Sequence, residues 1–136
     1  MDYDLIIPEQ GFDIKVITKT DSRKDFRVRV KAENSSYLPI SDRYISLYMT
    51  STSKVNDLTS WKRIDTVKGH NASALDMCYP MQTVYTNEEY VISLKDGEDV
   101  CIIAGITDNV LGGKVPDTAE EVAKNPAWGI ARVTAA

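Results

Sequence analysis

Only one histidine occurs among the 136 residues, and this limits the acid–base chemistry open to the chain. His70 would have to serve as the base of any triad of the serine or cysteine type. It lies in the turn sequence Gly69-His70-Asn71, and the chain contains no nucleophile elbow of the form G-x-S-x-G. We therefore expect a solvated loop histidine, no catalytic residue and no enzymatic activity.

Two cysteines, Cys78 and Cys101, are the other residues that could bind a metal. Together with His70 they would offer zinc three protein ligands, but none stands at a recognised spacing. We therefore expect no metal site. Both cysteines have apolar neighbours, which predicts small buried side chains, and a single disulfide between strands is the alternative.

The stretch Gly112-Gly113-Lys114 is rich enough in glycine to suggest phosphate binding. A P-loop also requires an earlier glycine and a serine or threonine directly after the lysine. Asp108 and Val115 occupy those two positions. The stretch is therefore interpreted as a flexible loop, and we expect no cofactor.

Paired carboxylates, which glycosidases use across a cleft, occur at three places in the sequence. They are Glu88-Glu89, Asp96 with Glu98-Asp99, and Glu120-Glu121. Each pair stands at an expected turn or helix start, where acidic residues are common because they are solvated. A weak calcium site at the Asp96 turn is an alternative, although the turn lacks the ligand pattern of an EF-hand.

The aromatic residues give the strongest indication of a binding surface. Tyr44 and Tyr48 alternate with Ile45, Leu47 and Met49, so the tyrosines should lie on the face opposite the core. Tyrosine is enriched at protein interfaces and also stacks on sugars. We therefore select Tyr44, Tyr48 and Trp61 as candidates for an interaction surface. The alternative is that these rings cover the rim of the fold.

Hydrophobic alternation with a period of two is the dominant pattern in the chain. It predicts a hairpin of two strands from Phe12 to Ala32, joined by the polar segment 20–25, and a third strand over 44–50. Further short strands are expected over 61–67, 72–78, 81–85, 90–95 and 128–133. The run from Val100 to Thr107 is apolar on both faces, which predicts a central strand.

One helix is expected near residues 117–125. Thr118 and Glu121 have the spacing of a capping box, and Glu120 and Glu121 suit the positive end of the helix dipole. Pro126 ends the pattern. Short strands with polar turns and a single short helix predict an all-β, antiparallel two-sheet β-sandwich, immunoglobulin-like or jelly-roll-like, with residues 1–136 forming a single domain.

The charge balance disfavours several classes of partner. The net charge of −4 argues against general affinity for nucleic acid, which requires clustered lysine and arginine. The N-terminal sequence MDYDLIIPEQG shows neither a signal peptide nor a membrane span, so we expect cytoplasmic synthesis and no membrane partner.

These observations together favour a surface-mediated role over catalysis. We expect a non-enzymatic structural or interaction module, a subunit that decorates or joins a larger assembly such as a virus (phage) capsid or tail. Its partners would then be other protein subunits, and the chain would be an oligomer or part of a particle such as a virion. The alternative is a carbohydrate-binding module that uses exposed tyrosine and tryptophan.

Overall fold

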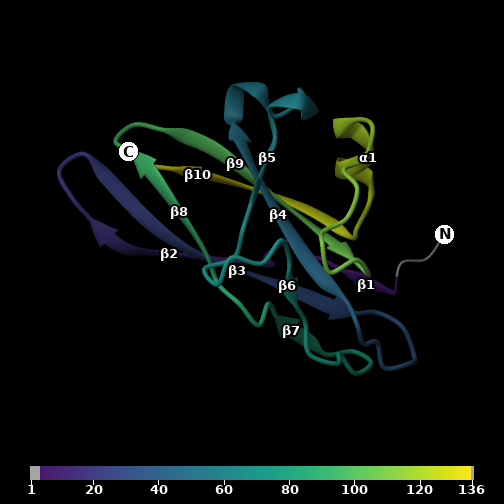
Figure 1. Cartoon of the computed structure of the whole chain (residues 1–136). Helices are drawn as coiled ribbons and strands as arrows, with labels where there is room; N and C mark the ends of the chain where they lie inside the picture. Colours follow the sequence, from purple (N-terminus) through teal and green to yellow (C-terminus); the bar gives the residue numbers. More distant parts are fainter. Residues whose placement is uncertain (1–3, 136) are drawn as a thin grey trace.

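The computed structural model describes residues 4–135 of the chain as two antiparallel sheets (Figure 1). The predicted two-sheet β-sandwich is confirmed. Each sheet contains five strands. In several places two strands follow one another along the same edge of a longer neighbouring strand.

The first sheet is organised around its longest strand, β3 (Arg23–Asn34). One edge of β3 pairs with β1 (Leu5–Ile6) and β2 (Phe12–Lys19). The other edge pairs with β7 (Thr83–Tyr85) and β8 (Tyr90–Lys95). The predicted hairpin of the first two long strands is confirmed, and β3 begins three residues earlier than the alternation indicated, because its polar start pairs with both neighbours.

The second sheet has the order β10 (Trp128–Thr134), β9 (Asp99–Thr107), β4 (Tyr44–Ser51) and β5 (Lys62–Ile64). The short strand β6 (Ser73–Ala74) also pairs with β4. The prediction that residues 100–107 form a central strand is confirmed, since β9 lies between β10 and β4 and is buried on both faces.

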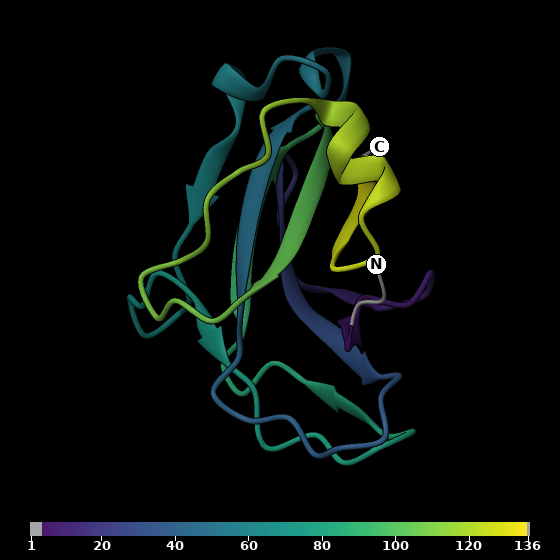
Figure 2. The same cartoon turned by 90° about the vertical axis from the view of Figure 1, so that its right-hand side faces the viewer.

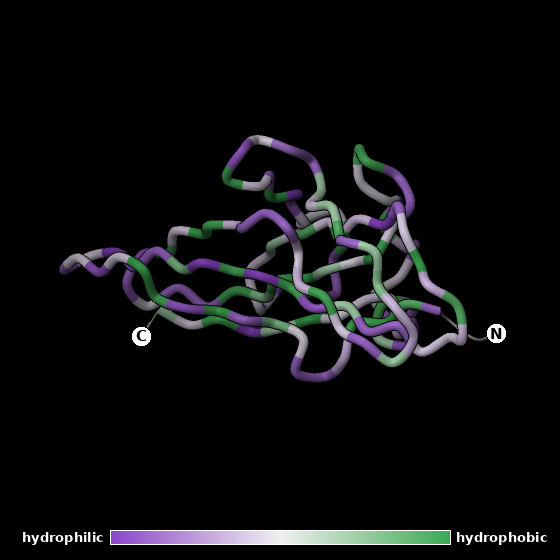
Figure 3. The backbone as a smooth tube through the Cα atoms, turned by 90° about the horizontal axis from the view of Figure 1, so that it is seen from below, coloured by the Kyte–Doolittle hydropathy of each residue, from purple (hydrophilic) through white to green (hydrophobic). Residues whose placement is uncertain are grey.

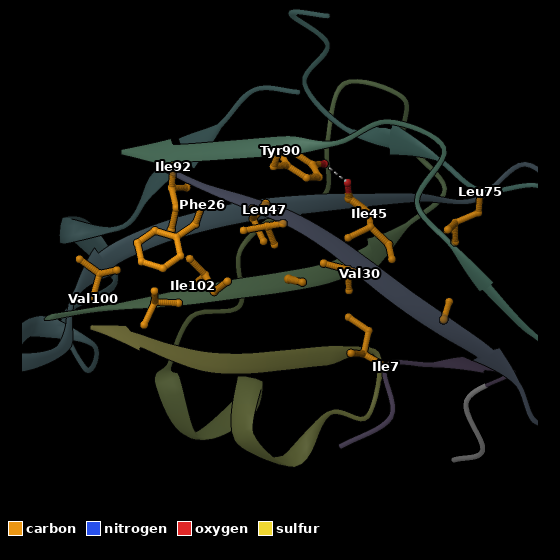
Figure 4. Packing of buried hydrophobic residues seen from close by; sticks show 14 of the residues in the cluster. Ile7, Phe26, Val30, Ile45, Leu47, Leu75, Tyr90, Ile92, Val100 and Ile102 are labelled. Carbon is orange, nitrogen blue, oxygen red and sulfur yellow. Dashed lines mark hydrogen bonds between the residues drawn. The ribbon is translucent and has the colours of Figure 1, made fainter. Parts of the chain in front are cut away.

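The main core fills the space between the two sheets. It contains Val28 of β3, which is fully buried. Val30 of β3, Leu47 of β4 and Ile102 of β9 are also fully buried there (Figure 4). The alternation in β3 and β4 placed Val28, Val30 and Leu47 on the inward faces, and they are found there. Tyr90 of β8 joins the two sheets, because its hydroxyl donates to the backbone oxygen of Ile45 in β4 at 2.6 Å.

A second layer covers the outer face of the second sheet. It consists of helix α1 (Ala119–Lys124), the loop that precedes it, and the single turns η1 (Thr52–Lys54) and η2 (Leu58–Ser60) (Figure 2). Val122 is the buried residue of α1. The predicted helix is confirmed in place and in its cap, since the Thr118 side chain accepts from the Glu121 backbone N–H at 3.2 Å.

The segments expected as strands over 72–78 and 81–85 contain few residues in regular β-strands. They contain only β6, β7 and the isolated bridges Ile40↔Cys78 and Leu75↔Thr86. Pro80 interrupts the run, because proline lacks the N–H that a ladder requires. The segment expected as a strand over 61–67 is likewise reduced to β5.

The two cysteines are free and buried, as the apolar neighbours predicted. Cys78 belongs to the core between the sheets, whereas Cys101 belongs to the cluster on the outer face of the second sheet. The sheet separates their side chains, so the alternative of a disulfide between strands is wrong for this structure.

Candidate binding surface

The predicted interaction residues Tyr48 and Trp61 are buried rather than exposed. Tyr48 does lie on the face opposite Leu47, as the alternation indicated, but only 7% of its surface is accessible, and only 9% of that of Trp61. Their ring centroids are 6.4 Å apart, and the Trp128 ring stacks on Tyr48 with a centroid separation of 6.1 Å. The expectation that both rings are exposed is therefore wrong.

Tyr48 and Trp61 are buried because two loops of the chain cover their rings. The Tyr48 hydroxyl donates to the backbone oxygen of Gly113 at 3.1 Å, and the Trp61 indole donates to the backbone oxygen of Val55 at 3.0 Å. Burial raises the pKa of the Tyr48 hydroxyl. The polar loops that carry Gly113 and Val55 fold back over the sheet, which alternation along β4 alone does not reveal.

Tyr44, the third candidate, is only partly exposed and lies beside the single histidine. It lines a hollow of about 380 Å³ together with His70, Glu88 and Leu111. The His70 side chain is 61% exposed, so the prediction of a solvated loop histidine is confirmed. Its Nδ1 atom lies 2.8 Å from the Glu88 carboxylate.

Hydrogen bonds from neighbouring residues stabilise the charged form of the Glu88 carboxylate. Burial raises its pKa, but hydrogen bonds from the Thr66 hydroxyl at 2.7 Å and from His70 outweigh that effect, so the pKa is lowered overall. The Thr66 hydroxyl also accepts from the His70 backbone N–H at 3.0 Å. This arrangement fixes the 66–70 turn, and it brings none of the other predicted carboxylate pairs close to His70.

A different region carries the most conspicuous exposed apolar side chains. Two loops at one end of the sandwich, residues 35–43 and 76–82, carry five of them, which we call the apolar tip. They are Tyr37, Leu38, Met77, Tyr79 and Met81, with exposed fractions of 97%, 72%, 48%, 51% and 82%. Single exposed apolar residues are normal, but such a group on two adjoining loops marks a candidate binding surface.

The buried side chain of Asn34 ties the two loops together. Its amide nitrogen donates to the backbone oxygens of Leu38 and Cys78, both at 2.8 Å. Its amide oxygen accepts from the Ser36 backbone N–H at 2.9 Å and from the Ser36 hydroxyl at 2.7 Å. All the hydrogen-bonding capacity of this buried amide is therefore used to position the base of the apolar tip.

Backbone pairing holds the same loops in register. Ile40 and Cys78 exchange two hydrogen bonds, at 2.9 and 2.8 Å. The Met81 backbone N–H donates to the Asn34 backbone oxygen at 2.9 Å, and Asn34 N–H donates to the Gln82 oxygen at 3.0 Å. The exposed apolar side chains therefore stand on a hydrogen-bonded framework that is present before any partner binds.

Met81 occupies a backbone conformation that normally selects glycine. The Gln82 N–H donates to the Tyr79 oxygen at 3.1 Å, which closes a turn with Pro80 and Met81 in its centre. Pro80 fixes the first central position at negative φ, and Met81 has φ of +65°, the combination of a type II turn. Glycine or asparagine is usual at that second position. An exposed methionine at that position is therefore unusual.

Carboxylates surround the apolar tip. Asp42 and Asp76 are exposed within the two loops, and Asp4 is exposed beside them. The Arg43 guanidinium donates to the backbone oxygens of Ser41 and Asp42 at 3.1 and 3.4 Å. A shallow hollow of about 450 Å³ opens between Asp4, Tyr37 and Arg43. The surface is thus apolar at its centre and mainly acidic around it.

The sequence did not single out the apolar tip, although a signal was present. The stretches Tyr37-Leu38-Pro39 and Tyr79-Pro80-Met81 place large apolar residues directly against prolines. Proline breaks the strand pattern, so an apolar residue next to it is not committed to a core-facing position. Attention to apolar residues outside the alternation would have found both loops.

Comparisons with known proteins place few limits on function. No protein-family model and no curated protein matches the sequence. Among solved structures, a "putative lipoprotein" of Bacillus subtilis is similar with a TM-score of 0.42 and 10% sequence identity, over 96% of this chain and 36% of that one. The chain therefore spans about a third of the length of that protein. A likeness this distant says nothing about binding.

Among residues 4–135, no three His, Cys, Asp or Glu side chains are grouped so that they could hold a metal ion. Within the same part of the chain, no helix is long and apolar enough to cross a bilayer.

Proposed function

We propose that the protein is a non-enzymatic interaction module that binds a protein partner through the apolar tip. The observation that supports this most strongly is Met81, which is exposed and held at positive φ. An exposed apolar side chain in a strained backbone conformation contributes nothing evident to folding. Contact with a partner gives both features a common explanation.

The energetics of such contact are favourable. Burying one large apolar side chain contributes about 1.5–3 kcal/mol, and Tyr37, Leu38 and Met81 are each mostly exposed in the free chain. The Asn34 framework reduces the entropy that binding would lose, because the loops are ordered beforehand. Methionine adapts to irregular partner surfaces, and tyrosine adds a hydroxyl at the edge of a large ring.

The chemistry of the apolar tip defines the kind of partner. Apolar side chains surrounded by Asp4, Asp42 and Asp76 fit a partner with an apolar depression and basic residues around it. As a finer proposal, we infer that this partner is a subunit of a larger assembly, such as a virus capsid or tail. End loops of a β-sandwich are well placed for such contacts, although this step is an analogy between folds.

The alternative of a carbohydrate-binding module has less support. It relied on Tyr44, Tyr48 and Trp61 as a platform for stacking on sugar rings. Two of these rings are covered by the protein's own loops, and a stacking platform requires an exposed ring face. Tyr37 and Tyr79 of the apolar tip are exposed, so a glycan ligand is a competing outcome of the test below.

The proposal is tested by affinity capture from the native source with three versions of the full chain. These are the wild type, Leu38→Ser in the apolar tip, and Val67→Ser as a matched control. Val67 is also exposed, at 64%, but it lies outside the apolar tip. Captured proteins are quantified by mass spectrometry, and direct binding is then measured with the purified partner.

We expect a partner that the wild type and Val67→Ser retain equally and that Leu38→Ser binds at least about tenfold more weakly, as the loss of a buried leucine side chain implies. Raising the salt concentration should also weaken binding, because the acidic side chains contribute at long range. Equal capture by all three versions, no partner at all, or binding to glycans alone would contradict the proposal.

A further inference from the structure

The outer edge of β2 carries backbone groups that no other strand of the described chain uses. β2 ends the row of strands in the first sheet and pairs only with β3. An unpaired edge strand presents hydrogen-bonding groups to any second strand that approaches it. β2 is also long for an edge strand, with eight residues from Phe12 to Lys19.

The direction of these backbone groups follows from the register. The Lys31 N–H donates to the Gly11 oxygen at 2.7 Å, so the backbone oxygen of Gly11 points toward β3. In an antiparallel ladder, the N–H and C=O of successive residues point alternately to the two edges of a strand. The groups of Phe12, Ile14 and Val16 therefore point to the free edge.

The side chains along the β2 edge are complementary to those of β2 in a second copy of the chain. Consider two β2 strands running antiparallel, with Ile14 of one copy opposite Ile14 of the other. Phe12 then faces Val16 on the core side, and Asp13 faces Lys15 on the outer side, each pair occurring twice. Residues 12, 14 and 16, whose backbone groups are free, are the ones that would exchange hydrogen bonds. Apolar residues meet apolar residues, and opposite charges meet.

We propose that two copies of the chain pair through their β2 edges in this register, which joins the two first sheets into one continuous sheet. Val16 is 53% exposed in the single chain, and the partner's Phe12 would cover it. The irregularity between Val16 and Thr18 limits the pairing to about five residues on each strand. The interface is therefore small, and the dimer is weak and dependent on concentration.

The edge lies apart from the apolar tip, so this pairing does not rest on the proposed function. β2 runs away from the end where β3 reaches Asn34, toward the turn that precedes Arg23. Both apolar tips stay uncovered in the dimer. If both proposals hold, the dimer binds two sites at once, and its overall affinity for a repeated surface exceeds that of either tip.

The test is sedimentation equilibrium of the full chain from about 10 μM to about 1 mM, the range in which small interfaces associate. Four variants accompany the wild type: Lys15→Asp, the double exchange Asp13→Lys with Lys15→Asp, Lys62→Asp and Leu38→Ser. The double exchange restores opposite charges in the same register. Lys62 is an exposed residue of β5 in the other sheet and provides a matched control.

We expect the wild type to dimerise and Lys15→Asp to weaken the dimer about tenfold, because two attractive cross-strand pairs become repulsive. The double exchange should recover the wild-type constant within about threefold, and Lys62→Asp should leave it unchanged. A wild type that stays monomeric to about 1 mM overturns the pairing. So does a dimer that ignores the charge exchanges, or one that only Leu38→Ser disrupts.

Discussion

The two ends of the sandwich reverse the chain in different ways. At the end where β8 turns into β9, Gly97 takes the positive φ value of +84°. At the apolar tip, Met81 and Asp42 have φ values of +65° and +58°. Glycine adopts this conformation without strain, whereas methionine does not. One end thus turns with a glycine, while the other places larger side chains in the same conformation, and this difference is the basis of the role that we propose for the apolar tip.

The two ends also differ in the polarity of their exposed side chains. The turns 19–23 and 95–98 form the end that we call the polar end. They carry lysine, aspartate and glutamate, and the Asp96 N–H donates to the Ser22 oxygen at 2.8 Å. The apolar tip instead exposes tyrosine, leucine and methionine. Figure 3 shows this difference as hydrophilic colour at the end near the C-terminus and hydrophobic stretches in loops at the opposite end. If solubility alone determined the loop sequences, we would expect polar side chains at both ends.

The largest difference between the ends should appear when their hydrogen-bonding side chains are removed. Asn34→Ala removes the buried amide that links the backbone oxygens of Leu38 and Cys78 to Ser36, and we expect the free energy of unfolding to fall by about 2–4 kcal/mol. At the polar end, Glu98→Ala removes an exposed bond to the Lys95 N–H, and the change should stay within about 0.5 kcal/mol. Urea unfolding measures both. Equal losses would show that the tip has no special framework.

The sequence predicted the ladder well because alternation depends on short-range spacing. Phe26 to Ala32 alternate inward and outward in one strand, and the structure places them as expected. The cap at Thr118 is also local, since it depends on residues three apart. Periodicity and capping could therefore be read without knowing which segments meet in space.

The candidate surface could not be predicted in the same way, because exposure depends on distant segments. Tyr48 and Tyr37 are the same residue type, yet Tyr48 is covered by Gly113, sixty-five positions away. Tyr37 has no such cover and is 97% exposed. Alternation identifies the face of a strand on which a ring lies, but not whether a loop later folds over that face.

A substitution at Gly97 measures what a positive φ costs a residue other than glycine at the polar end. A Cβ atom there would meet nothing within 4 Å, so Gly97→Ala tests backbone conformation alone. We expect a destabilisation of about 1 kcal/mol, because alanine adopts positive φ less readily. Thermal unfolding measures it. A neutral result would mean that positive φ is inexpensive in this fold, which would weaken the argument from Met81.

Acid should affect the polar end before the apolar tip. The Arg132 guanidinium and the Thr52 hydroxyl bond Asp99 and lower its pKa to about 2, from a usual value of 3.8. A carboxyl whose folded pKa is depressed stabilises the fold above its unfolded pKa. That contribution is lost as the pH falls from about 4 toward 2.

The Asp99→Asn variant tests this pH dependence. Stability measured from pH 5 to pH 2 should fall less steeply in the variant than in the wild type. The protection factors of the Cys78 and Met81 amides, from which the intrinsic pH dependence of exchange has been removed, should change little over the upper part of that range, because neutral groups hold the apolar tip. Identical pH profiles for the two proteins would show that Asp99 contributes nothing to the difference between the ends.

The most direct test of the central claim is Met81→Gly, assayed for both stability and partner binding. Glycine suits a φ of +65°, so the free energy of unfolding should stay the same or rise by about 1 kcal/mol. Partner capture should fall by about tenfold, because the exposed methionine side chain is lost. A variant that gains stability and loses binding supports a side chain kept for recognition. A variant that binds like the wild type, or that is clearly less stable, contradicts it.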